Sequence, residues 1–80
     1  MASHTISART PGVFYRRPSP DAEPYVEDGA TVAEGDTIGL IEVMKTYREV
    51  KTDTAGTVAR WLVDNEDEVT IGQTLVELDT

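Results

Sequence analysis

The sequence predicts an all-β fold built from short strands, and three observations support this prediction. First, 24 of the 80 residues are β-branched (nine Val, four Ile and eleven Thr), whereas Leu and Ala number only four and seven. Second, short apolar runs separated by Gly, Asp, Asn and Pro are typical of strands joined by turns. Third, no window keeps the apolar spacing of an amphipathic helix. We therefore expect a sandwich of short strands.

Five apolar runs give the expected strands in chain order. The first run follows Gly12 and ends before a proline-rich stretch, and the second follows Gly35-Asp36. The fourth run begins after Gly56 and ends at Asp64-Asn65, and the last follows Gly72. Most of these boundaries thus contain residues that favour turns. The expected strands cover residues 13–15, 38–43, 47–50, 57–63 and 75–78.

The two halves of the chain resemble each other. Residues 32–38 match residues 69–75 at an offset of 37, and residues 12–16 match residues 56–60 at an offset of 44. Two matched blocks are harder to explain by chance than one, so we expect a fold with quasi-twofold symmetry. The change of offset means that the first half carries seven extra residues, at positions 18–24.

The extra segment has a composition of its own. Pro18, Pro20 and Pro24 fix φ and lack backbone N–H donors, so this segment cannot be a central strand. We expect residues 18–24 to form a stiff loop that projects from the domain.

The repeat also predicts where unusual backbone is needed. Gly29 in the first half corresponds to Glu66 in the second. If Gly29 has a positive φ, then either Asn65 takes that conformation in the second turn or Glu66 carries a strain of about 1 kcal/mol. The acidic run at residues 64–68 is interpreted as a solvated turn and not as a metal site.

Charge and composition exclude several classes of function. The chain has 15 acidic residues against seven Lys and Arg, a net charge of −8, and no basic cluster larger than Arg16-Arg17, so a nucleic-acid backbone would be repelled. It has no Cys and a single His, His4, so the chain lacks the side chains needed for thiol chemistry and for most metal sites. No membrane span or signal peptide is seen, so we expect a soluble, cytoplasmic domain over residues 9–80, preceded by a flexible segment over residues 1–8.

The centre of the repeat breaks a local rule. Two strand-like runs meet at Met44-Lys45, and neither residue is a usual turn former. A hairpin with these residues at its tip would expose a large apolar side chain beside an amine. Such a local conflict often marks a functional site.

Glu42-Val43-Met44-Lys45 resembles the Glu-Ala/Val-Met-Lys signature of biotinyl domains, the family of biotin carboxyl carrier proteins. The repeated Val-x-x-Gly-Asp/Gln-Thr blocks and the start of the strand at Gly56-Thr57-Val58 extend this resemblance over nearly the whole chain. The insert from Arg17 to Ala22 is similar to the "thumb" loop of bacterial acetyl-CoA carboxylase carriers. The resemblance implies a barrel-sandwich hybrid, a flattened barrel of two antiparallel four-stranded sheets with quasi-twofold symmetry and an exposed hairpin that bears a modified lysine, with the chain termini at the opposite end.

The resemblance also implies roles for individual residues. Lys45 matches the lysine that is joined to biotin by an amide, and the resemblance implies that four residues around it belong to the attachment site: Met44, Glu42, Val43 and Thr46. Thr46 stands where the family often has Met, and Arg17 stands where carriers of acetyl-CoA carboxylase tend to have Thr. The implied thumb comprises Arg17, Pro18, Ser19, Pro20, Asp21, Ala22, Glu23 and Pro24. No catalytic or metal-binding residue is implied.

A carrier function follows from the resemblance. Biotin, attached to Lys45 by a biotin protein ligase, would accept CO₂ at a biotin carboxylase and deliver it to a carboxyltransferase, that of acetyl-CoA carboxylase in fatty acid biosynthesis. The chain itself would be a carrier and not an enzyme, with neither a nucleic acid nor a membrane as partner. Two alternatives stay open at this point. A lipoyl carrier shares the fold but typically has Asp-Lys where this chain has Met44-Lys45, and an unmodified interaction module would use the acidic surface and the thumb.

Overall fold

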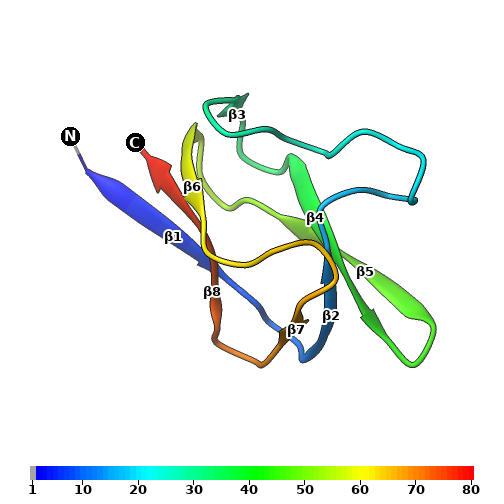
Figure 1. Ribbon diagram of the computed structural model, residues 1–80. Coiled ribbons are helices and arrows are strands. Elements are labelled where there is room, and N and C mark those ends of the chain that lie inside the picture. The colour runs from blue at the N-terminus through cyan, green and yellow to red at the C-terminus, as the bar shows by residue number, and fades with distance from the viewer. Residues whose placement is uncertain (1) are drawn as a thin grey trace.

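The computed structural model describes residues 2–80, which form two antiparallel sheets of four strands packed face to face (Figure 1). One sheet has the strand order β1-β8-β6-β3 and the other the order β5-β4-β2-β7. Each sheet thus combines strands from both halves of the chain, and the expected barrel-sandwich hybrid is confirmed. The strands are β1 (Ser3–Ser7), β2 (Gly12–Tyr15), β3 (Thr31–Val32), β4 (Thr37–Val43), β5 (Thr46–Lys51), β6 (Gly56–Trp61), β7 (Glu68–Val69) and β8 (Thr74–Asp79).

The repeat in the sequence is also a repeat in hydrogen bonding. Asp36 and Gln73 occupy equivalent positions, and each accepts a hydrogen bond from the backbone N–H three residues earlier. The distances are 2.9 Å from Ala33 N and 3.0 Å from Thr70 N. These matching turns confirm the quasi-twofold symmetry and explain why a Gly-Asp/Gln-Thr block occurs twice.

The second pair of equivalent turns shows how the repeat tolerates a difference. Gly29 and Glu66 have φ values of 85° and 73°, and their N–H groups donate to Val58 O and Phe14 O at 2.8 and 2.6 Å. Glu66 therefore takes the conformation that the repeat demands, which is the second of the two alternatives expected from the sequence. A non-glycine residue there carries strain of about 1 kcal/mol.

The core consists of two apolar clusters between the sheets. Phe14 is fully buried in one cluster, and Trp61 and Val50 pack against both. The rings of Phe14 and Trp61 lie 5.5 Å apart at 39°, a tilted arrangement favourable for aromatic pairs. The clusters contain Ile6, Val32, Ile38, Val58, Val76 and Leu78 in one case, and Ala8, Phe14, Ile41, Val63, Val69 and Leu75 in the other.

The N-terminal region differs from the expectation. Residues 3–7 form β1, which pairs with β8, whereas the sequence predicts a flexible segment over residues 1–8. The reason is that Ile6 and Ala8 are buried in the core, at 7% and 3% exposure. The segment therefore contributes apolar contacts although most of its residues are polar. His4 Nε2 also lies 2.9 Å from Asp53 Oδ1, and this hydrogen bond lowers the pKa of Asp53. Met1 lies outside the described residues.

The chain ends meet at one end of the domain and the β4–β5 hairpin extends at the other (Figure 1). Thr80 N donates to Ala2 O at 3.0 Å. This agrees with the expected separation of the termini from Lys45. Within residues 2–80, no helix has the length and apolar character needed to span a membrane.

Candidate functional site at the β4–β5 hairpin

The tip of the β4–β5 hairpin is a two-residue turn. Val43 pairs with Thr46, which leaves Met44 and Lys45 as the turn, with φ values of 48° and 65°. Positive φ at both central residues is typical of the type I′ turn, which matches strand twist but normally contains Asn and Gly. Met44 is 93% exposed, so no packing compensates for its unusual backbone. The hairpin thus places a strained Met-Lys pair in solvent.

Relief of this strain gives a first testable prediction. Replacement of Met44 by Asn and Lys45 by Gly should raise the free energy of unfolding by about 1–2 kcal/mol, because Asn and Gly adopt positive φ at lower cost. The melting temperature should rise by roughly 5–10 °C, measured by circular dichroism. The matched control, Met44→Leu, keeps the strain and should leave the melting temperature unchanged. Equal stability of the double variant and the parent would contradict the assignment of strain to this turn.

Lys45 has an accessible side chain. It is exposed, and no carboxylate of residues 2–80 lies within ion-pair distance of its amine. The other lysine of the chain, Lys51, lies at the end of β5 with its Nζ 3.9 Å from Glu49 Oε1. The two lysines therefore differ in position and in neighbours, and only Lys45 lies at a hairpin tip.

A group of polar side chains stands behind the tip on the outer face of the sheet. The Tyr15 hydroxyl donates to Glu42 Oε1 at 3.1 Å, and Tyr47 lies opposite Glu42 in the register of β4 and β5. The rings of Tyr15 and Tyr47 are 6.4 Å apart. The hydrogen bond to Glu42, with smaller contributions from burial and from the charge of Glu42, raises the pKa of Tyr15 above 10.0. Glu42 is thus held by Tyr15.

The tyrosine gives a second prediction. A raised pKa means that the Tyr15–Glu42 hydrogen bond contributes stability below pH 10.0 and that this contribution is lost as the pH rises through the pKa of the folded state. Glu42→Gln should lower the pKa of Tyr15 toward its ordinary value, which can be followed through the Tyr15 ring resonances by NMR. Glu49→Gln, which removes a carboxylate from β5, is the control and should leave Tyr15 unchanged. An unaltered titration in Glu42→Gln would show that Glu42 does not hold the phenol.

Residues 18–24 form an exposed loop between β2 and β3 (Figure 1). Tyr25 N donates to Arg16 O at 2.8 Å and closes the base of the loop. The Arg16 guanidinium lies 4.7 Å from the centre of the Trp61 ring and 3.7 Å from Asp28. Arg16 N also donates to Asn65 Oδ1 at 2.7 Å. The loop therefore starts from a residue anchored on the second half of the repeat.

A hollow of about 180 Å³ separates this loop from the outer face of the sheet. Arg17 Nε is buried and has no hydrogen-bond partner among the described residues, which leaves a donor unused beside the hollow. Tyr15, Leu40 and Tyr47 form the sheet side of the hollow, and none of the three was expected at the site from the sequence. For Tyr47, its position two residues after Lys45 is a feature of the sequence that indicates a place near the site. The loop side consists of Arg17, Pro18, Ser19 and Pro20, with Asn65 and Glu66.

The structure groups only part of the expected site. Arg17 to Pro20 line the hollow, but Asp21, Ala22, Glu23 and Pro24 lie farther along the loop and do not line it. Met44, Lys45 and Thr46 are at the exposed tip and do not line it either, whereas Glu42 is joined to it through Tyr15. The site therefore consists of an exposed amine at the hairpin tip and a small aromatic hollow on the outer face of the same sheet.

Comparisons with known proteins agree with this geometry. A family model described as "Biotin-requiring enzyme" matches residues 4–78. The chain is 32% identical over 79 residues to the biotin carboxyl carrier protein of acetyl-CoA carboxylase of Haemophilus influenzae, covering 99% of this chain and 51% of that protein. It is 43% identical over 67 residues to the protein of the same name in Streptococcus pyogenes, covering 84% and 40%. The chain thus spans about half the length of these relatives or less.

A solved structure has the same fold. The crystal structure of Kluyveromyces lactis urea carboxylase matches with a TM-score of 0.79 at 24% sequence identity, over 99% of this chain and 6% of that protein. At this level of identity the match supports the two-sheet architecture alone.

Proposed function

Because the chain belongs to the family of biotin-requiring enzyme domains, we propose that it is a biotin carboxyl carrier domain with its prosthetic group on Lys45. The observation that carries this proposal is the exposed amine at the tip of the paired β4–β5 hairpin, remote from the chain termini. The names of the relatives from H. influenzae and S. pyogenes support a role in acetyl-CoA carboxylase and thus in fatty acid biosynthesis. The proposed partners are a biotin protein ligase, a biotin carboxylase and a carboxyltransferase.

The residues present fit biotin. Lys45 would hold it through an amide, and the hollow beside the thumb offers Tyr47 as an apolar wall and the unpartnered Arg17 Nε–H as a donor. When bound, biotin supplies a ureido nitrogen that carries a carboxyl group. The carriers that the sequence resembles tend to have Thr at the position of Arg17, so Arg17 would give this chain a charged hydrogen-bond donor in place of a hydroxyl.

The other residues of the site position the tether. The paired strands β4 and β5 hold Lys45 away from the body of the domain, where a ligase and two enzymes can reach it. Met44, exposed and apolar, offers a contact to the enzymes that recognise the tip. Tyr15 holds Glu42 at the base of the tip. None of these residues is assigned a catalytic step, so the proposed domain is a non-catalytic carrier.

Intact mass after co-expression tests this function. The chain is produced with a biotin protein ligase in one culture and with a lipoyl ligase in another. We expect a mass gain of one biotinyl group in the first culture and none in the second. A gain of one lipoyl group alone would identify a lipoyl carrier, and no gain in either culture would favour an unmodified interaction module.

Deletion of residues 18–24 gives a third prediction. The deletion should leave the fold and biotinylation intact, because the loop is exposed and the Tyr25 N–Arg16 O hydrogen bond already brings its ends together. Carboxyl transfer with the cognate enzymes should become about tenfold slower, which corresponds to the loss of about 1.4 kcal/mol of positioning energy. Steady-state rates of both half-reactions provide the measurement.

One further variant and one contradicting outcome complete this test of the loop. Arg17→Thr in the intact loop tests the donor at the hollow separately and should slow transfer less than the deletion does. An unfolded deletion variant, or one with the parent's rates in both half-reactions, would show that the loop does not have the proposed role.

A further inference from the structure

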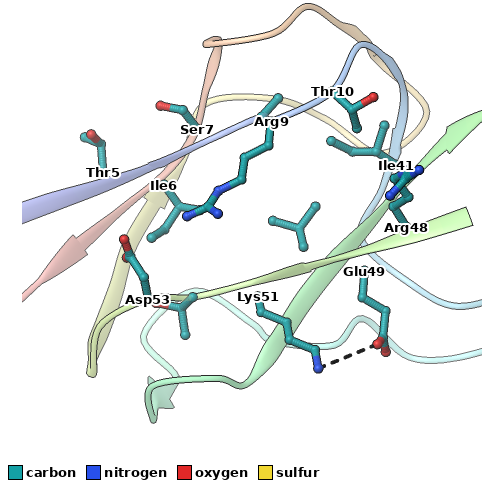
Figure 2. Close-up of a pocket in the computed structure, with 13 residues that line it drawn as sticks. Thr5, Ile6, Ser7, Arg9, Thr10, Ile41, Arg48, Glu49, Lys51 and Asp53 are labelled. Carbon is teal, nitrogen blue, oxygen red and sulfur yellow. Dashed lines mark ion pairs between the residues drawn. The ribbon is translucent and has the colours of Figure 1, made fainter.

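A second, more voluminous hollow lies on another side of the domain, where the two sheets open between β1 and β5 (Figure 2). Its volume is about 820 Å³. Ile6, Ala8 and Ile41 form an apolar floor together with Val50. The hairpin tip and the thumb do not contribute to it. We refer to this hollow, from Thr5 to Thr10 on one side and from Arg48 to Asp53 on the other, as the edge groove.

Both walls of the edge groove are sheet edges. β1 and β5 are the end strands of their sheets, so each has one side without a strand partner. In a hairpin with a two-residue turn, the two residues that flank the turn form a hydrogen-bonded pair, which here is Val43–Thr46. Along the two strands, pairs with and without backbone hydrogen bonds then alternate, so the next pair, Glu42–Tyr47, has none. The backbone N–H and C=O groups of Tyr47 and Glu49 therefore point to the free edge of β5. These groups are available to pair with an added strand.

The charge of the edge groove differs from that of the rest of the chain. Of the seven Lys and Arg residues in the chain, Arg9, Arg48 and Lys51 line the groove, against two of the 15 acidic residues. Both acids are already engaged, Glu49 with Lys51 at 3.9 Å and Asp53 with His4 at 2.9 Å.

The two arginines of the groove have no such partner. Neither Arg9 nor Arg48 has an acidic partner within ion-pair distance among residues 2–80. In Figure 2, Arg9 extends into the hollow from the side of β1 and Arg48 lies beside Ile41. Glu49 and Lys51 point away from β1 and pair with each other. The groove therefore presents two arginines without a direct ion pair above an apolar floor, although the charge of Arg9 still acts on Asp53 at the rim.

We propose that the edge groove binds an extended, acidic peptide segment of a partner protein, which adds as a strand to β5. Its backbone pairs with Tyr47 and Glu49, its apolar side chains pack on Ile6, Ile41 and Val50, and its carboxylates reach Arg9 and Arg48. Alternate side chains of a strand point to opposite sides, so a segment with alternating acidic and apolar residues satisfies both requirements.

Charge favours this occupant over a second copy of the chain. A second copy would bring a net charge of −8 over its whole surface, whereas a short acidic segment brings only a few carboxylates, which can lie next to Arg9 and Arg48. A small anion would use the arginines but leave the apolar floor and the free edge of β5 unoccupied. A peptide strand uses all three features.

The test is a binding measurement with the 80-residue chain and a fluorescent peptide of the sequence Glu-Val-Asp-Val-Glu-Val. We expect saturable binding by anisotropy with a Kd of the order of 100 μM, weakened by added salt because charge pairs contribute. The matched peptide Lys-Val-Lys-Val-Lys-Val should not bind. Amide exchange of Tyr47 and Glu49 should slow when the acidic peptide is bound.

Two pairs of variants locate the site. Arg9→Gln with Arg48→Gln should weaken binding about tenfold, whereas Arg60→Gln, which alters an exposed arginine on β6, should leave it unchanged. Glu49→Pro removes a free edge donor at a position where an edge strand tolerates Pro and should weaken binding at least tenfold. Glu49→Ala removes the same carboxylate but keeps the donor and should still bind.

Several outcomes would overturn the proposal. Equal binding of the lysine peptide would exclude recognition of acidic side chains. Undiminished binding by a Glu49→Pro variant that keeps its melting temperature would exclude strand addition to β5. Complete competition by inorganic phosphate would show that the groove binds an anion and not a peptide strand. Dimerisation of the chain through this face in sedimentation experiments would assign the groove to a second copy. Absence of binding by the acidic peptide at millimolar concentration would likewise refute it.

Discussion

Lys45→Arg should abolish biotin labelling of the chain and leave its thermal unfolding unchanged. Arginine keeps the positive charge and the bulk of the side chain, but its guanidinium stays protonated and does not form the amide with biotin. Lys45 is exposed at the hairpin tip and has no ion pair within the described residues, so its replacement removes no packing and no salt bridge. Streptavidin binding and intact mass measure the label, and circular dichroism measures the fold.

Lys51→Arg is the matched control because Lys51 is the only other lysine of the chain. It lies at the end of β5 in contact with Glu49, and its replacement should leave labelling at the level of the parent. Label that survives in Lys45→Arg and disappears in Lys51→Arg would move the attachment site to Lys51. Label lost together with the fold would show that the tip contributes to stability, which its exposure argues against.

The repeat explains why so much of the fold could be predicted. Two blocks at different offsets are enough to imply equivalent turns, and the structure has them at Asp36 and Gln73 with nearly equal hydrogen bonds. The exposed Met44-Lys45 tip was also predictable, because two poor turn formers between strand-like runs suggest that something other than stability selects them. Both predictions use the sequence pattern alone and need no knowledge of tertiary contacts.

The features that could not be predicted depend on tertiary contacts. β1 has the polar sequence Ser-His-Thr-Ile-Ser, and its pairing with β8 depends on a core position for Ile6 that no local pattern reveals. β3 and β7 have two residues each, too few to produce an apolar run. The hollow beside the thumb combines Tyr15 with Tyr47, which are brought together only when β2 and β5 flank β4.

Gly39→Ala should lower the free energy of unfolding by about 3 kcal/mol or more, although it adds one methyl group in β4. A Cβ at Gly39 would lie 2.6 Å from two ring carbons of Phe14 and 3.0 Å from Tyr15 O. Phe14 is fully buried against Trp61, so its ring has no space to move, and added atoms in a packed core typically cost 1–3 kcal/mol or more. The melting temperature should fall by at least about 12 °C, or the variant should fail to fold.

Two companion variants separate this clash from a general intolerance of glycine replacement. Gly35 has a φ of 91° with no atom within 4 Å of an added Cβ, so Gly35→Ala should cost only the backbone strain of about 1–2 kcal/mol. Phe14→Leu in the Gly39→Ala background makes room for the methyl group, so the two substitutions together should cost at least about 1 kcal/mol less than the sum of their separate effects. Additive losses would place the strain elsewhere in β4. A coupled pair would show that Gly39 is required because the Phe14 ring packs directly on the backbone of the strand that carries the Lys45 hairpin.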